Sequence, residues 1–370
     1  SEIMPNMLPK NMPENPIDDP TAASRKEDHI ELAFRSQVDT MALDERFYYE
    51  PLLAAHPPAG SLPEVAFGNK RMKAPLWVSS MTGGTEKAYI INQNLARACN
   101  EFGLGMGLGS CRPLLSGTER LKDFDIRPLT GDKVPLYANL GIAQIQELFA
   151  AGREQEIRQM CDLLRVDGLI VHVNPLQEAM QPEGDVFTEA PLATMTATLA
   201  VLPGLPIIVK EVGQGMGPQS LAQLLRLPLL AIDTAANGGT NFSKLELLRS
   251  DDARQEAYES IVNIGHGANE MVGWVNELLA KEHAQAMEQT REGTDLARTR
   301  VQCKHLIISG GLRTFLDGYY LTEKSNLPAI YGQASDFLKY ARSDYATLQR
   351  YVTEQVRGLE LAKAYLRPRT

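Results

Sequence analysis

Short apolar runs alternate with helical stretches along most of the chain, and this alternation constrains the fold more than any other feature. Strands that are covered on both faces read as short continuous apolar segments, so each run predicts a buried parallel strand. The eight runs span residues 75–80, 104–110, 135–141, 168–174, 206–213, 229–236, 305–311 and 329–334. Between runs, residues 85–102, 143–164 and 218–227 have the spacing of amphipathic helices. Eight strands that alternate with helices predict a closed (β/α)8 barrel, the TIM-barrel form of the α/β class.

An open doubly wound sheet is the alternative architecture for such a pattern. It is less favoured because no GxGxxG sequence opens a helix after the first predicted strand. The stretch at about 244–304 is too long for a barrel connection and has a charged helical pattern, so we expect a helical insertion there, between strands six and seven. We expect an irregular extension over residues 1–24 and one barrel domain over 25–370, with a helical tail from about residue 336.

Composition narrows the classes of partner. The chain has 370 residues, a net charge of −9 and a pI near 5.3, which gives no basic field for a nucleic-acid backbone. No apolar run approaches the ~20 residues that a membrane helix needs, and the first residues lack the pattern of a signal peptide. The four cysteines are scattered and form no CxxC pair, so neither a zinc site nor a disulfide framework is indicated. These features predict a cytoplasmic protein without nucleic-acid or membrane partners.

Residues 172–178 (HVNPLQE) gather polar side chains at the end of the fourth predicted strand. Side chains alternate along a strand, so His172 and Asn174 share one face. The proline that follows cannot donate to a sheet, which places Gln177 and Glu178 on the loop beyond the strand. Catalytic groups of barrel enzymes lie at the carboxyl ends of the strands. The cluster therefore predicts a catalytic site; a hydrogen-bonded set that only ends the strand is the alternative.

The later strand ends carry features of a phosphate and ring site. Backbone N–H groups in the glycine loops after strands seven and eight can bind a phosphate, and Arg313 can add a bidentate cation. Lys210 lies in an otherwise apolar run, where a charge is costly unless it faces an anion or an electron-rich ring. Flavin mononucleotide (FMN) would satisfy both features. A lysine that reaches solvent or pairs with Glu211 is the alternative.

Further cations lie in two other places. Arg112 follows the second predicted strand, and residues 24–29 (SRKEDH) include Arg25 and Lys26. A solvated surface pair is the simple explanation of Arg25 and Lys26 taken alone. A substrate diphosphate would give these cations a role, because it binds arginine and lysine through charge-assisted hydrogen bonds.

Taken in order, these motifs resemble those of the type 2 isopentenyl-diphosphate isomerases, a family of flavin-dependent (β/α)8 enzymes. The resemblance runs from Arg25 to about Ala334, and its most specific parts are RKEDHI and HVNPLQE. Two departures stand out: Cys111 takes the place of a usual glutamine, and Ala236 that of a usual glycine. The matching motifs are RKEDHI (25–30), MTGG (81–84), GSCR (109–112), NLG (139–141), HVNPLQE (172–178), KEVG (210–213), NGGTNF (237–242) and GGLR (310–313).

The resemblance implies a site, residue by residue. Gln177 and His172 are the implied catalytic residues, and Glu178 is the implied Mg²⁺ ligand. The implied FMN contacts are Ser80, Met81, Thr82, Ser110, Asn139, Lys210, Thr240, Gly311, Arg313, Ala334 and Ser335. The implied substrate contacts are Arg25, Lys26, His29, Ser110, Arg112, Asn174 and Gln177.

The implied reaction converts isopentenyl diphosphate to dimethylallyl diphosphate in isoprenoid biosynthesis. A proton is added at the terminal alkene carbon and another is removed from the neighbouring methylene, beside reduced FMN. The resemblance also implies NADPH as the reductant and a homotetramer or larger homo-oligomer. An FMN-dependent 2-hydroxy-acid oxidase or dehydrogenase is one alternative. It would need a histidine base on a later strand, whereas His305 lies at a strand start. A non-catalytic flavin or phosphate binder is the other.

Overall fold

The computed structural model describes residues 21–79, 85–292 and 301–369. The chain divides into two compact units, one ending at Arg46 and the other beginning at Phe47. The first unit contains the helix α1 (Ala22–Arg35) and a short 3-10 turn, η1 (Thr40–Ala42). The second unit carries the barrel.

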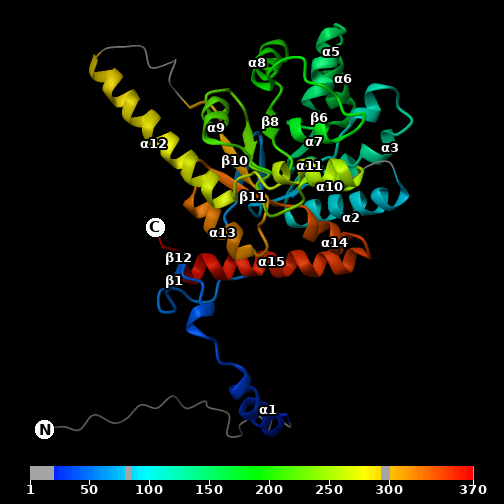
Figure 1. Ribbon diagram of the computed structural model, residues 1–370. Helices are drawn as coiled ribbons and strands as arrows, with labels where there is room; N and C mark the ends of the chain where they lie inside the picture. The colour runs from blue at the N-terminus through cyan, green and yellow to red at the C-terminus, as the bar shows by residue number, and fades with distance from the viewer. Residues whose placement is uncertain (1–20, 80–84, 293–300, 370) are drawn as a thin grey trace, which may run out of the picture. The chain divides into compact units, whose positions relative to one another are not determined.

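Eight parallel strands form a closed barrel, which confirms the predicted fold class (Figure 1). They follow the chain around the barrel, and β11 pairs with β4 to close it. The strands are β4 (Leu76–Ser79), β5 (Gly105–Gly107), β6 (Leu136–Gly141), β7 (Gly168–His172), β8 (Ile207–Lys210), β9 (Ala231–Asp233), β10 (His305–Ile308) and β11 (Ala329–Gln333). Each strand lies within one of the eight apolar runs.

Helices surround the barrel. They are α2 (Glu86–Phe102), α3 (Leu121–Phe124), α4 (Arg127–Thr130), α5 (Ile142–Ala150), α6 (Gln155–Leu164), α7 (Pro175–Met180), α8 (Pro191–Val201), α9 (Pro218–Leu225), α10 (Phe242–Leu248), α11 (Asp252–Val262), α12 (Ala268–Glu292), α13 (Phe315–Lys324), α14 (Ser335–Ala341) and α15 (Tyr345–Tyr365), with the 3-10 turn η2 (Arg112–Leu115). The helical pattern of residues 143–164 forms two helices, because Gly152 adopts φ +68° and ends the first. Between β9 and β10 lie α10, α11 and α12, and α12 packs against α9 and α13. No described helix is both long and apolar enough to cross a membrane.

The barrel interior is a separate core, filled by side chains from the strands. Trp77 and Tyr137 are fully buried there, with Ile170, Ile208 and Ile307 around them. A hairpin of β2 (Val65–Phe67) and β3 (Lys70–Met72) adds Phe67 and Met72 to this core. Its Gly68-Asn69 turn places Gly68 at φ +59°, a conformation that suits glycine. The hairpin therefore closes the amino-terminal end of the barrel.

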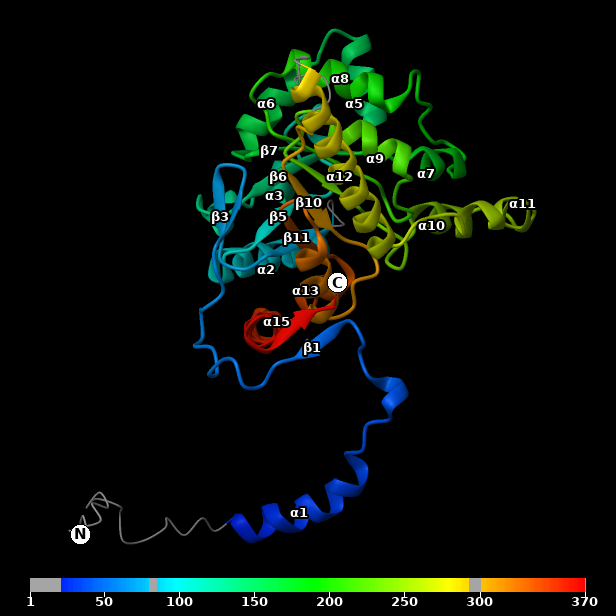
Figure 2. The same ribbon diagram turned by 90° about the vertical axis from the view of Figure 1, so that its left-hand side faces the viewer.

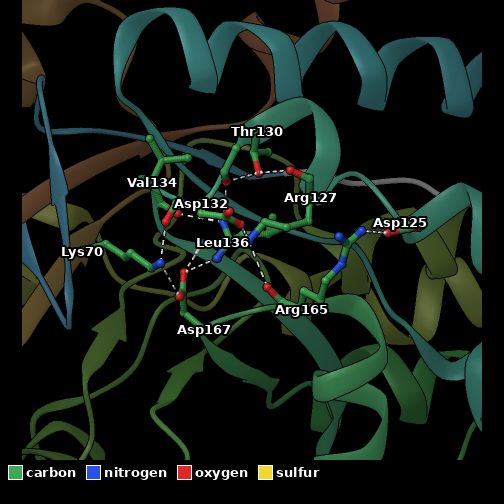
Figure 3. Close-up of polar contacts among 10 residues, drawn as sticks. Lys70, Asp125, Arg127, Thr130, Asp132, Val134, Leu136, Arg165 and Asp167 are labelled. Atoms are coloured by element: carbon green, nitrogen blue, oxygen red, sulfur yellow. Dashed lines mark hydrogen bonds and ion pairs between the residues drawn. The ribbon is translucent and has the colours of Figure 1, made fainter.

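Two further contacts, a strand pairing and a buried ion pair, connect segments of the second unit that are distant in sequence. The last strand, β12 (Leu366–Pro368), follows α15 and pairs antiparallel with β1 (Phe47–Tyr49), as Figures 1 and 2 show. At the amino ends of β6 and β7, Arg127 and Asp167 form a buried ion pair of 2.9 Å (Figure 3). Arg127 also donates to the backbone oxygens of Val134 and Arg165, at 2.9 Å each. Asp167 accepts from the backbone N–H of Leu136, so the pair ties both strands to α4.

Candidate active site at the carboxyl ends of the strands

A cavity of ≈ 260 Å³ lies at the carboxyl ends of the barrel strands. All eight strand ends contribute to its lining. The residues are Ser79, Gly109, Ser110, Asn139, His172, Gln177, Lys210, Val212, Gly213, Ala235, Ala236, Gly239, Thr240, Phe242, Ser309, Gly310, Gly311, Leu312, Gly332, Gln333, Ala334, Ser335 and Asp336. The sequence-predicted residues Ser110, Asn139, His172, Gln177, Lys210, Thr240, Gly311, Ala334 and Ser335 are therefore brought together.

His172 is held in one protonation state. Its Nδ1 atom lies 2.7 Å from Oδ1 of Asn139 on the neighbouring strand. An amide oxygen only accepts, so Nδ1 carries a hydrogen, and in the neutral ring Nε2 then keeps its lone pair. Burial, followed by repulsion from Lys210, lowers the pKa of His172 to about 4. His172 is thus a neutral hydrogen-bond acceptor at neutral pH. Gly141 packs closely on this ring, since a Cβ on Gly141 would lie 2.7 Å from Nε2.

Gln177 and Glu178 lie on a helix, although the sequence placed them on a loop. Pro175 is the first residue of α7, a position where a missing N–H costs nothing. Consecutive helical side chains point about 100° apart, so the two residues face different surroundings. Gln177 lines the cavity. Glu178 accepts instead from the backbone N–H of Asp185, at 2.8 Å.

Asn174 links the two side chains. It is buried, and its Nδ2 group donates to Gln177 Oε1 at 2.9 Å and to Glu178 Oε1 at 3.1 Å. Because the Gln177 oxygen is engaged, the Gln177 amide nitrogen is the group that can donate to a bound molecule. Asn174 does not line the cavity itself and instead orients Gln177.

Lys210 projects from the end of β8 into the lining. Among the described residues, none forms a hydrogen bond or ion pair with its ammonium group. The alternative pairing with Glu211 does not occur. Glu211 is buried and accepts from the backbone N–H groups of Gln214 and Gly215, at 2.6 and 3.1 Å. Lys210 therefore offers its positive charge to the cavity.

The loops after β9 and β10 pack backbone against backbone. Gly310 has φ +93°, and a Cβ there would lie 2.2 Å from the backbone oxygen of Ala236. Sequence reasoning missed the side chains that fasten these loops. Ser309 donates to the buried carboxylate of Asp233, and Thr234 donates to the Ser309 backbone oxygen at 2.7 Å. Only their places at neighbouring strand ends signalled this link.

Several predicted residues lie elsewhere. Ser80, Met81 and Thr82 fall outside the described residues. Arg25, Lys26 and His29 belong to α1 in the first unit, where Arg25 and His29 are four residues apart and share a face. Arg313 is exposed and outside the cavity lining. Its backbone N–H donates to Asp317, a carboxylate that also caps the start of α13.

Arg112, the cation after the second barrel strand, meets a partner that sequence reasoning did not identify. Its Nη1 atom lies 3.2 Å from Oδ2 of Asp185, a residue between α7 and α8. Gln144 donates to the same oxygen from 3.0 Å. Next to Arg112, the Cys111 thiol is fully buried, and burial raises its pKa to about 12. Cys111 thus packs as an apolar side chain.

Metal binding by the protein alone is not supported in the described part of the chain. Within it, no three His, Cys, Asp or Glu side chains gather around one point. Glu178 offers one carboxylate, whose oxygens keep lone pairs beyond the hydrogen bonds from Asn174 and Asp185. Such a site suits Mg²⁺ only if a ligand supplies further oxygens.

A second cavity, of ≈ 770 Å³, lies between α8 and α9 outside the barrel. Its lining is mostly apolar and includes Met195, Met216 and Leu224. The buried carboxylate in its wall is Glu211, which the backbone N–H groups of the next loop already satisfy. The smaller cavity is therefore the one that gathers polar groups suited to chemistry.

Solved structures share this fold at low sequence identity. A mandelate oxidase variant with benzaldehyde aligns with a TM-score of 0.50 and 13% identity, over 86% of this chain and 82% of that chain. A second mandelate oxidase variant, with 2-hydroxy-phenylacetamide, aligns with a TM-score of 0.51 and 14% identity, over 88% and 86%. At such identities the likeness shows the barrel fold alone.

Sequence relatives are closer. No family model matches the chain. An isopentenyl-diphosphate delta-isomerase of Rickettsia typhi (strain Wilmington) is 32% identical over 86% of this chain and 85% of its own length. Those of Rickettsia africae (strain ESF-5) and Rickettsia prowazekii (strain Madrid E) are 30% and 31% identical, over 91% and 86% of this chain and 91% and 85% of their own lengths. With this identity over most of both chains, the protein belongs to the isopentenyl-diphosphate delta-isomerase family.

Proposed function

We propose that this protein interconverts isopentenyl diphosphate and dimethylallyl diphosphate in the flavin-dependent, type 2 manner. It would use reduced FMN in the strand-end cavity and Mg²⁺ beside Glu178. The observation that carries the proposal is the meeting of three side chains in one cavity: Gln177, neutral His172, and Lys210, which has no ionic partner within the described part of the chain. The family of the sequence relatives supports the substrate. A homotetramer or larger assembly, and NADPH as reductant, belong to the same proposal.

The cavity residues fit FMN. Lys210 faces the cavity without an anionic partner among the described residues, as a cation beside an electron-rich ring would. Gly310 and Gly311 bring bare backbone to the wall, with Ala334 and Ser335 nearby in the lining. These four residues would hold the phosphate, Lys210 would hold the ring, and Asn139 would keep His172 in place. When bound, reduced FMN would supply an electron-rich surface and an exchangeable proton beside the alkene.

The protein's own residues would divide the remaining work. Gln177, held at its oxygen by Asn174, would orient the reacting carbons through its amide nitrogen. His172 stays uncharged, so it would accept a hydrogen bond and not act as an acid at neutral pH. A neutral His172 also adds no positive charge of its own beside a cation-like transition state. Arg112 would bind the diphosphate, and Glu178 would hold Mg²⁺ against its oxygens.

A 2-hydroxy-acid oxidase on the same barrel is the competing function. It would place a histidine base at the end of a later strand. Here His305 is the first residue of β10, at the opposite end of the strand, and its ring packs on Phe67 at 5.0 Å. The histidine of the described cavity lining is His172 on β7. The geometry therefore favours the isomerase.

The test is turnover by the full chain reconstituted with FMN. Under anaerobic conditions, we expect dimethylallyl diphosphate to form after reduction by dithionite or NADPH, and not with oxidised flavin. Omission of Mg²⁺ should abolish most of the rate. Lactate and mandelate serve as oxidase controls. Full turnover by the oxidised enzyme, or oxidation of a hydroxy acid without isomerisation, would disprove the proposed function.

A further inference from the structure

We propose that Asp185 is a positioning residue, which holds Arg112 in place to receive the substrate's diphosphate. The identity of the substrate rests on the proposed function. The role of Asp185 rests on its own contacts, which join the segment between α7 and α8 to three other parts of the site.

The first contact is the ion pair with Arg112. One guanidinium nitrogen, Nη1, lies 3.2 Å from Asp185 Oδ2, and the Arg112 side chain is 55% exposed. A guanidinium has five N–H donors. A contact through one nitrogen therefore orients the Arg112 guanidinium and leaves its other donors for phosphate oxygens. Without Asp185, an exposed arginine would sample many rotamers and would have to be ordered when the diphosphate binds.

The other contacts make Asp185 a firm anchor. Gln144 on α5 donates to the same Oδ2 at 3.0 Å, while its own oxygen accepts from the Gly141 backbone at 3.0 Å. The Asp185 backbone N–H donates to Glu178 at 2.8 Å. Next to it, a Cβ on Gly184 would lie 1.8 Å from the Glu178 backbone oxygen, so the segment lies directly against α7.

These contacts connect the two ends of the substrate site. Glu178 accepts from Asn174, and Asn174 donates to Gln177. A continuous series of hydrogen bonds therefore runs from Arg112, which would bind the diphosphate, to Gln177, which would lie by the reacting carbons. Asp185 is the member of the series that touches Arg112. Its negative charge is offset by Arg112 and the Gln144 amide, so we expect its orienting effect to outweigh its repulsion of the diphosphate.

The experiment measures binding of inorganic diphosphate to the FMN-loaded full chain, by calorimetry in the presence of Mg²⁺. Asp185→Ala should weaken binding between about 2- and 10-fold, the cost of ordering one long side chain. Asp185→Asn keeps an oxygen for Gln144 and should have a smaller effect. Glu183→Gln is the matched control, because Glu183 is exposed on the same segment, and it should bind like the wild type.

The Arg112→Ala background shows whether Asp185 acts through Arg112. There, Asp185→Ala should have no further effect on diphosphate binding. With isopentenyl diphosphate, Asp185→Ala should raise KM by a similar factor and change kcat by less than about threefold, with unchanged flavin content. A general collapse of the segment would instead lower kcat and flavin content in both backgrounds.

The outcomes separate the two proposals. If Asp185→Ala binds inorganic diphosphate as tightly as the wild type or more tightly, or if the wild type does not bind it, the role of Asp185 is disproved. If binding depends on Asp185 but no dimethylallyl diphosphate forms under any reducing condition, the proposed function is wrong and the positioning role stands.

Discussion

Gln177 and Glu178 are neighbours in sequence that face different surroundings, and their replacements should therefore fail differently. Gln177 lines the cavity from α7, whereas the glycine loop that would hold the phosphate of FMN follows β10. Gln177→Ala should keep its flavin and its fold and lose roughly 10²–10³ in turnover, the usual cost of one preorganised polar group at a developing charge. The measurement is kcat of the reduced enzyme at saturating Mg²⁺. Normal turnover by this variant would contradict the assigned role.

Glu178→Gln should change the metal dependence instead. The amide keeps an oxygen for Asn174 and loses the charge that would attract Mg²⁺. We expect a higher Mg²⁺ concentration for half-maximal rate, with part of the lost rate recovered at high Mg²⁺. A magnesium series run on both variants makes the comparison, since Gln177→Ala should not respond to added metal.

His172 should make stability depend on pH in a defined window. Its pKa is about 4 in the folded chain, below the ordinary value of 6.5, so the unfolded chain binds the proton more readily. The contribution of neutral His172 is therefore complete above pH 6.5 and is lost as pH falls toward 4. Over that window the loss is at most about 3 kcal/mol. Urea unfolding at several pH values should show a steeper decline for the wild type than for His172→Gln; equal declines would contradict the lowered pKa.

At the scale of elements, the Arg127–Asp167 pair ties the amino ends of β6 and β7 together (Figure 3). The cavity lies at the carboxyl ends of the same strands. Asp167→Asn removes the buried countercharge of Arg127 and should lower the free energy of unfolding by about 3 kcal/mol. Asp132→Asn is the control, because Asp132 is 93% exposed and 3.9 Å from Arg127, and it should change stability by less than about 0.5 kcal/mol. The folded fraction of each variant should keep wild-type kcat.

The elements that the sequence predicted are those with a local signal. The eight barrel strands were found because buried parallel strands are short, apolar and bounded by Gly or Pro. The pairing of β1 with β12 was not, because strands of three residues at opposite ends of the second unit carry no local pattern. The sequence predicts a loop where α7 lies, since six residues opened by a proline are too few to show helical periodicity.

The residues of the candidate site also fall into those that the sequence could predict and those that it could not. His172, Lys210 and Asn139 could be placed from sequence because a strand end and its alternation decide where a side chain points. Asp185 could not, since its contact with Arg112 joins residues 73 positions apart through a segment without regular structure. The sequence also did not reveal that Arg313 is exposed outside the cavity lining, where its backbone N–H donates to Asp317.

At the scale of the whole molecule, ligand binding in the cavity should stabilise the barrel globally, because every strand end contributes to the lining. FMN at 100 times its Kd should add about 2.7 kcal/mol to the free energy of unfolding. Riboflavin, which lacks the phosphate, should stabilise less at the same concentration. Thermal unfolding of the flavin-free chain with each compound checks this. An equal shift in Tm would show that the glycine loops do not bind a phosphate.

The hairpin of β2 and β3 limits the route by which molecules reach and leave the cavity. Phe67 and Met72 fill the amino-terminal end of the barrel, and Trp77 and Tyr137 fill its middle. Because the barrel interior is closed in this way, molecules can enter and leave the cavity only at the carboxyl ends of the strands. Two molecules that share such a cavity cannot exchange independently: the deeper one loads first and departs last. An isomerase built this way would keep its flavin through many turnovers, while substrate and product come and go above it.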